Sequence, residues 1–164
     1  ERLFDIELEY TFSTSEQAWA ALVLALEIQD IPKFFKKWKT SRDFAKTVEQ
    51  IVEILKLREK GSLDKRACYK YDKRLLLLAE ELREASELSV DYLAIERVYD
   101  SLTIHDKHEV VVNGGMLIKE YGFQPGPALG EILTKIEYAI VDGELANEKE
   151  AIIAYIQQVK EEEK

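Results

Sequence analysis

The stretch STSEQAWAALVLAL, residues 13–26, sets the expected fold class of this chain. Ser13 followed three residues later by Glu16 is the pattern of a capping box, which predicts that a helix begins here. The segment from Trp19 to Leu26 is apolar nearly all round a helix, and such a helix belongs in the middle of a bundle. We therefore expect an all-α fold in which the Trp19–Leu26 helix is among the most buried elements.

The segments that follow carry helical signals of their own. Residues 40–60 place apolar side chains at the period of a helix with one buried face, and Gly61 then provides a typical C-terminal stop. Asp30 before Pro32 predicts another helix start, because proline is tolerated in a first turn. Further helices are expected over residues 64–71, 73–85 and 91–102. The apolar stripe of residues 40–60 consists of Phe44, Val48, Ile51, Val52 and Leu55.

Aromatic and basic side chains alternate in the short segment after Pro32. Phe34, Phe35 and Trp38 are expected to be buried, while the four lysines between and beside them stay in water.

The sequence changes character after residue 102. Residues 105–112 are polar and then β-branched, without a helical period, so we predict a helical body over residues 1–102 and a smaller C-terminal helical unit over 103–164. In that unit Asn147 and Glu150 form a second capping-box pattern. The last helix is expected to fray in its acidic end, residues 161–164.

The C-terminal unit contains a glycine- and proline-rich turn, LIKEYGFQPGPALG, residues 117–130. The pattern predicts a helix, a tight hairpin and a second helix that begins at Pro127. Backbone N–H groups near Ala128 to Gly130 would then face outward, and with the helix dipole they would form an anion site. This arrangement resembles the helix-hairpin-helix mode of holding a sugar-phosphate backbone. The alternative is a plain turn whose glycines allow close packing.

The charge is distributed unevenly along the chain. The formal net charge is −9, yet residues 33–74 hold 14 Lys or Arg against 6 Asp or Glu, a balance of +8. The remainder holds 9 against 26, a balance of −17. A basic segment within an acidic chain is a candidate footprint for a polyanion. The alternative is a set of solvated helix faces.

Catalytic motifs are not found. His105 and Asp106 invite a metal-phosphohydrolase interpretation, but the only other histidine is His108 in the same loop. The chain has no phosphate-cradling GxxxxGK[ST] motif and no Asp-x-Asp pair for two-metal chemistry. We predict no catalytic and no metal site. The lone Cys68 is expected to be a small buried hydrophobe in a reducing, cytoplasmic protein.

Six segments together resemble one family. VNGGMLIKE (112–120), GPALGEIL (126–133), DG (142–143) and NEKEA (147–151) are similar to the tail of the bacterial CCA-adding tRNA nucleotidyltransferases, which are also named after poly(A) polymerase. FSTSEQAWA (12–20) and KKWK (36–39) are similar to the body of the same family. The order and the combination of these segments make the resemblance specific.

The resemblance implies a non-catalytic role. The family is built as head, neck, body and tail, and nothing here resembles the head, which holds the metal-binding carboxylates, or the nucleotide-selecting neck. A start at Glu1 without methionine also predicts an excised fragment. The fragment is expected to hold no cofactor, whereas the parent enzyme would use Mg²⁺ with CTP and ATP. Body and tail would grip tRNA by its shape and phosphates.

Three groups of residues are the predicted RNA-backbone contacts. Seven of these cations are expected to share a face: Lys36, Lys37, Lys39, Arg42, Lys46, Arg66 and Lys70. The rival interpretation is a non-catalytic helical protein-interaction scaffold without membrane or RNA partners, which the net charge of −9 favours. The predicted contacts are Lys36, Lys37, Lys39, Arg42 and Lys46; then Lys65, Arg66, Lys70 and Lys73; then Lys119 with Gly126, Ala128 and Gly130 of the hairpin.

Overall fold

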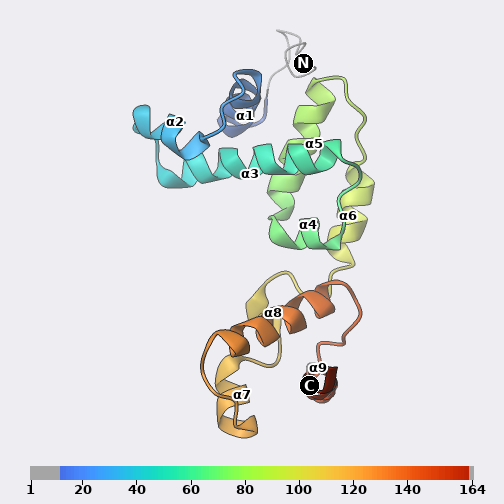
Figure 1. Ribbon diagram of the computed structural model, residues 1–164. Helices are drawn as coiled ribbons and strands as arrows, with labels where there is room; N and C mark the ends of the chain where they lie inside the picture. Colours follow the sequence, from blue (N-terminus) through green and yellow to red (C-terminus); the bar gives the residue numbers. More distant parts are fainter. Residues whose placement is uncertain (1–11, 163–164) are drawn as a thin grey trace. The chain divides into compact units, whose positions relative to one another are not determined.

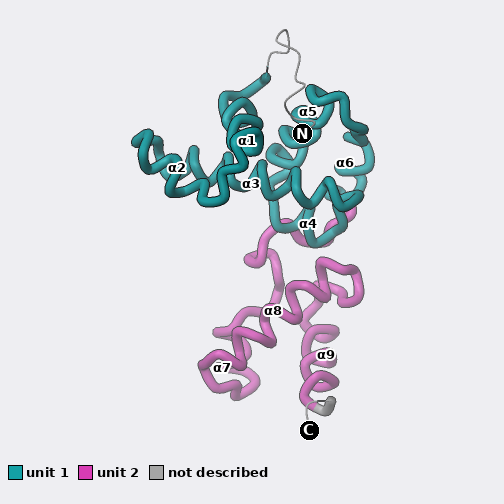
Figure 2. Tube along the Cα trace, turned by 45° about the horizontal axis from the view of Figure 1, so that its top comes forward, with its two compact units in different colours: residues 1–100 teal, residues 101–164 magenta. Residues whose placement is uncertain are grey.

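The computed structural model describes residues 12–162, and this part of the chain contains helices and no strand (Figure 1). The prediction of an all-α fold is confirmed. The chain divides into two compact units, the first ending at Asp100 and the second beginning at Ser101 (Figure 2).

Six helices make up the described part of unit 1. The longest, α3, packs against α1, α2 and α5, while α6 packs against α4 and α5. Their bounds are Ser15–Ala25 for α1, Ile31–Lys37 for α2, Arg42–Glu59 for α3, Lys65–Lys70 for α4, Lys73–Ala85 for α5 and Tyr92–Asp100 for α6.

Helix α3 carries the core of unit 1 on one face. Val48 and Ile51 are fully buried, and Val52 and Leu55 are nearly so, as the apolar stripe predicts. Ile54 is also buried, although the predicted stripe does not include it. Burying each such side chain stabilises the fold by about 1.5–3 kcal/mol.

Helix α1 is less buried than its composition predicts. Ala20 and Val23 are in the core, but Leu22 is 42% and Leu26 54% exposed. The expectation of a central helix is therefore wrong. The physical reason is that α1 packs against α3 and α5 and, through Trp19, against Phe35 of α2, whereas its face with Leu22 and Leu26 stays exposed.

The start of α1 is also displaced by one residue from the predicted capping box. Thr14 is the N-cap, and its backbone N–H donates to Oε1 of Gln17 at 2.9 Å. Ser13 is occupied elsewhere, since its hydroxyl donates to a Glu81 carboxylate oxygen on α5. Gln17 is fully buried and donates to the Leu78 carbonyl and to Glu81 at 3.0 and 2.7 Å. This network fixes the start of α1 against α5.

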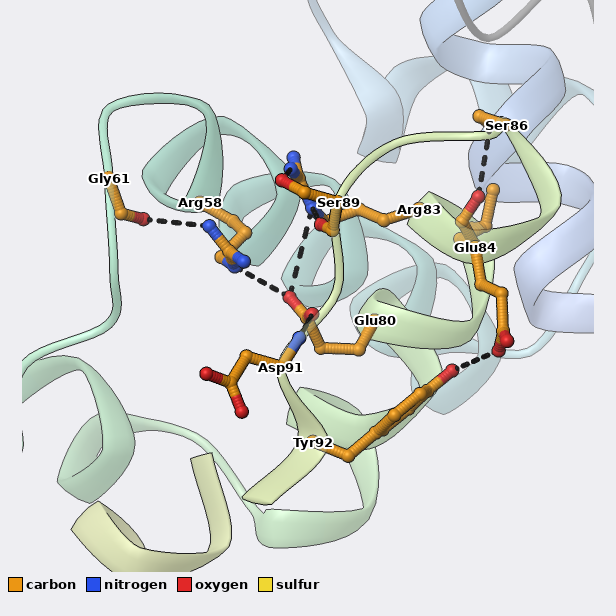
Figure 3. Close-up of polar contacts among 10 residues, drawn as sticks. Arg58, Gly61, Glu80, Arg83, Glu84, Ser86, Ser89, Asp91 and Tyr92 are labelled. Carbon is orange, nitrogen blue, oxygen red and sulfur yellow. Dashed lines mark hydrogen bonds and ion pairs between the residues drawn. The ribbon is translucent and has the colours of Figure 1, made fainter. Parts of the chain in front are cut away.

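Three charged side chains form a second polar network inside unit 1 (Figure 3). The Glu80 side chain is 1% exposed, and its carboxylate accepts from Arg58 Nε at 2.7 Å and from the Asp91 backbone N–H at 3.1 Å. Arg83 donates to the Ser89 carbonyl at 3.1 Å. The network joins the end of α3, the middle of α5 and the loop that precedes α6.

Unit 2 is a smaller helical assembly in which α8 packs against α7 and α9. A single 3-10 turn, η2, precedes the helices. The bounds are Lys107–Glu109 for η2, Gly114–Tyr121 for α7, Pro127–Val141 for α8 and Lys149–Glu162 for α9.

Two expectations for the end of the chain are corrected. The Asn147 side chain does not close a capping box, because it bonds across to the loop before α7, accepting from Val111 N and donating to the Glu109 carbonyl at 3.0 and 2.8 Å. Helix α9 continues through Glu162, beyond the predicted start of fraying, and residues 163–164 lie outside the described part. Within residues 12–162, every helix is too short or too polar to cross a membrane.

Candidate nucleic-acid interface

The corner between α2 and α3 is built by local hydrogen bonds. The Asp30 carboxylate accepts from Lys33 N at 2.9 Å and starts α2, and the Ser41 hydroxyl accepts from Phe44 N at 3.1 Å and starts α3. Between the two helices, Lys39 adopts a left-handed conformation at φ 52°. The chain therefore turns sharply between two well-capped helices, which brings the end of α2 beside the first turns of α3.

This corner encloses a basic hollow of about 510 Å³. Four of its lining residues are cations, against one acid, Glu49. Arg42 and Lys46 are four residues apart on α3 and therefore share a helix face, whereas Lys36 lies on α2 and Lys39 in the turn between the two helices. The cations are Lys36, Lys39, Arg42 and Lys46, and the remaining lining residues are Pro32, Phe35, Thr40, Ser41 and Ala45.

Aromatic packing holds the corner together. Phe35 is 1% exposed, and its ring meets that of Phe44 edge-on at 5.7 Å between centroids. Such pairs contribute about 0.5–1.5 kcal/mol beyond the area that they bury. Because Phe35 and Phe44 belong to different helices, this contact fixes α2 against α3. The cations that line the hollow are thus presented by a rigid support.

The structure brings together four of the nine predicted cations of unit 1. Lys37 is exposed on α2 but does not line the hollow. Lys65 is half-buried and Arg66 exposed on α4.

Two of the remaining cations have acidic partners. Lys73 Nζ is 3.3 Å from an Asp100 carboxylate oxygen, and Lys70 Nζ is 3.6 Å from Glu53. A hydrogen bond with the Tyr71 hydroxyl, reinforced by Glu53, raises the pKa of Lys70 above its ordinary value. The carboxylates of Glu53 and Asp100 therefore reduce the electrostatic attraction of Lys70 and Lys73 for an external anion.

The hairpin of unit 2 has the predicted helix-turn-helix form. Gly122 ends α7 in the left-handed conformation, at φ 67°, and Gly126 precedes α8 at φ 159° without a side-chain cap. Ala128 is exposed, but the N–H of Gly130 donates to the Gly126 carbonyl at 3.3 Å. The expectation that the Gly130 N–H faces outward is therefore wrong, because it already closes the first turn of α8.

Cations around the hairpin also have partners within unit 2. Lys160 Nζ lies 3.7 Å from the centre of the Phe123 ring, and Lys149 Nζ lies 2.6 Å from Glu120. The hydrogen bond with Glu120 raises the pKa of Lys149. Lys119 is exposed on α7. The strongest concentration of predicted contacts is consequently the hollow of unit 1.

Comparison with known proteins decides the family. Residues 10–156 match the family model described as tRNA nucleotidyltransferase domain 2. The chain belongs to this family. The resemblance to CCA-adding tRNA nucleotidyltransferases is thereby confirmed.

The individual relatives of this chain are named CCA-adding enzymes. It is 61% identical over 159 residues to the CCA-adding enzyme of Streptococcus pneumoniae serotype 19F (strain G54), covering 97% of this chain and 40% of that protein. The enzyme of Streptococcus sanguinis (strain SK36) is 59% identical, with coverage of 98% and 40%. The chain thus spans about 40% of the length of these relatives.

A solved structure shares the fold of this family member. The crystal structure of the Bacillus stearothermophilus CCA-adding enzyme in complex with CTP is similar with a TM-score of 0.83 at 27% identity. The similarity covers 93% of this chain and 40% of that one.

Metal-dependent nucleotidyl transfer has a ligand requirement with which the described residues can be compared. That step uses ligands around two metal ions about 3.5–4 Å apart. Within residues 12–162, no three His, Cys, Asp or Glu side chains gather so that they could hold a metal ion. His105 and His108 are both exposed, and His108 Nε2 is 3.9 Å from an Asp106 oxygen. The histidine loop is a solvated turn.

The sequence did not predict two features of unit 1, one at the interface and one in the interior. Trp38 is 61% exposed, although it was expected to be buried with Phe34 and Phe35. Its place between two lysines is the signal that marks it as a surface residue. The Arg58–Glu80 pair was also missed, and the only signal for it is a charged residue on the buried side of α5.

Proposed function

We propose that this chain is the part of a CCA-adding tRNA nucleotidyltransferase that grips tRNA. The observation that carries the proposal is the convergence of Lys36, Lys39, Arg42 and Lys46 on one hollow. Double-helical RNA is recognised mostly through its shape, its phosphates and its 2′-hydroxyls, and a rigid group of cations meets the phosphates without reading bases. Phosphate neutralisation also releases counterions, which drives association.

The chemistry of nucleotide addition belongs to other parts of the parent protein in this proposal. The head and neck that the family resemblance implies would add C, C and A to the 3′ end of tRNA, using CTP, ATP and Mg²⁺. The parent enzyme would act in the bacterial cytoplasm. The segment described here would hold the RNA backbone in place during the additions, since a substrate that is held in one orientation reacts faster than one that diffuses.

A binding experiment with a matched charge reversal tests the proposal. Retention of tRNA on filters at low ionic strength is measured for the unchanged chain, for Arg42→Glu and for Arg97→Glu. Arg42 lines the hollow, whereas Arg97 is exposed on α6, which lies at the other end of unit 1 from α2 in both views (Figures 1 and 2). A glutamate at position 42 suits the first turn of α3, so the fold is kept.

We expect Arg42→Glu to lower tRNA affinity by at least tenfold and Arg97→Glu by less than threefold. Equal losses from both variants would mean that bulk charge, and not a site, governs binding. The absence of tRNA retention by the unchanged chain would contradict the proposal and favour the protein-interaction scaffold.

A further inference from the structure

Trp38 is a large aromatic side chain in an unusual position. The residue is 61% exposed at the end of α2, whereas the neighbouring Phe35 is 1% exposed. The indole is nevertheless held firmly, because its ring lies 6.2 Å from Trp19 and 6.3 Å from Phe34 between centroids. The backbone N–H of Trp38 donates to the Phe35 carbonyl at 3.0 Å and ends α2. The ring is thus supported within an aromatic cluster and leaves much of its surface open.

The surroundings of this ring are strongly cationic. Residues 31–42 contain five Lys or Arg and no Asp or Glu. Lys37 and Lys39 flank Trp38 in the chain and are both exposed. The left-handed turn at Lys39 then leads directly into the basic hollow of Lys36, Lys39, Arg42 and Lys46. An open aromatic ring and a concentration of positive charge therefore occur at one corner of unit 1.

This combination selects the chemistry of the ligand. Paired bases of duplex RNA are stacked inside the helix, so they offer no free face on which the indole of Trp38 can stack. An unpaired nucleotide offers a free base for an aromatic ring and phosphates for the lysines, and proteins that bind single strands combine these same two elements. An acidic peptide would satisfy the lysines, but it would leave the exposed ring without a stacking partner.

We propose that Trp38 and the cations of residues 31–42 form a site for an unpaired nucleotide of RNA. The base stacks on the Trp38 ring, and the flanking phosphates lie against Lys37, Lys39 and the hollow. The site rests on the proposed function, since it adds a contact to a loop, bulge or strand end of an RNA that the neighbouring cations hold by its backbone.

Two RNA probes and two tryptophan variants test the site. The Trp19→Phe variant leaves Trp38 as the only tryptophan, and its fluorescence is followed during titration with single-stranded oligo(A) and with a blunt RNA duplex at low ionic strength. We expect the single strand to quench the emission and the duplex to leave it nearly unchanged. In filter binding, Trp38→Ala should weaken the single strand roughly 5- to 100-fold and the duplex less than twofold.

The outcomes separate this site from the proposed function. If tRNA is retained in an Arg42-dependent manner but Trp38 is not quenched and Trp38→Ala binds single strands normally, the nucleotide site is wrong and the backbone grip stands. If Trp38→Ala weakens the binding of both RNA probes equally, the ring only stabilises the corner between α2 and α3, and the proposed nucleotide site is again wrong. Quenching by poly-glutamate but not by oligo(A) would assign the corner to an acidic protein partner. Failure of the unchanged chain to retain any RNA overturns both proposals.

Discussion

Arg58 Nε lies 2.7 Å from Oε1 of Glu80, a side chain of which 1% is exposed to solvent. Arg83 Nε lies 3.8 Å from the same oxygen, so one buried carboxylate faces two guanidinium groups. Burial, and then the nearby Arg58 charge, lower the pKa of Arg83. Glu80 therefore compensates two cations within unit 1 and also accepts from the loop before α6 (Figure 3).

Removal of this carboxylate charge should destabilise unit 1. We expect Glu80→Gln to lower the free energy of unfolding by roughly 2–4 kcal/mol, because the buried Arg83 and the half-buried Arg58 lose their counter-charge. Urea unfolding followed by circular dichroism measures the change. Glu84→Gln is the control, since Glu84 is exposed and bonds the Tyr92 hydroxyl, and we expect less than about 1 kcal/mol there. Similar losses of stability at both positions would mean that the buried carboxylate of Glu80 stabilises unit 1 no more than the exposed carboxylate of Glu84.

Binding of tRNA should depend steeply on salt. If three or four cations of the hollow meet phosphates, the slope of log K against log salt should be about −2 to −4. Arg42→Gln should make the slope less negative by about 1, and Arg97→Gln should leave it unchanged. Lys160 is unsuitable as the control, because its ammonium group lies over the Phe123 ring and is not in a frayed end. A slope near zero would rule out phosphate contacts.

The chain by itself should not add nucleotides to tRNA. Residues 12–162 offer no cluster of carboxylates for a metal pair, and two-metal catalysis depends on such ligands. Incubation of the purified chain with tRNA, Mg²⁺ and labelled CTP or ATP should therefore give no incorporation above a mock purification. Incorporation that copurifies with the chain would show that a transfer site has been overlooked.

Cys68 should react with thiol reagents only when unit 1 unfolds. The residue is fully buried, and burial raises the pKa of its thiol to about 11, with a smaller contribution from Asp64. Between the ordinary pKa of a thiol, about 8.5, and this value, the Cys68 thiol is ionised in the unfolded chain and neutral in the folded chain. The folded state therefore keeps its full stability at neutral pH and loses stability as the pH rises through that range.

Alkylation with iodoacetamide at pH 8 measures the effect. We expect labelling of the folded chain to be at least tenfold slower than labelling in urea, because the reactive species is the thiolate. Equal rates in both states would mean that Cys68 is accessible.

Two glycines should respond to alanine in opposite ways. Gly122 has φ 67°, a conformation that costs an L-residue about 1–2 kcal/mol, so Gly122→Ala should destabilise unit 2. Gly130 lies inside α8 with nothing within 4 Å of an added Cβ, so Gly130→Ala should stabilise it by about 0.5–1 kcal/mol. Thermal unfolding of the two variants checks both signs. Destabilisation by Gly130→Ala would indicate a contact that the structure lacks.

Local signals in the sequence were sufficient for most helices. The stripe from Phe44 to Leu55 predicts α3, because a helical period in apolar residues follows from the geometry of one chain segment. Asp30 and Pro32 predict the start of α2 for the same reason, since a cap acts within its own first turn. Four of the hollow's lining cations were also named from the local charge balance.

Only the tertiary structure decided which side chains are buried and which hydrogen-bond partners they have. Leu22 and Trp38 are exposed although they are apolar, and Glu80 is buried although it is charged. Asn147 bonds a loop 36 residues away and not its own helix. Periodicity identifies a face of a helix, but burial depends on which other segments cover that face, and a hydrogen bond forms with whichever partner the folded chain brings near. Those partners are distant in sequence, and only packing brings them together.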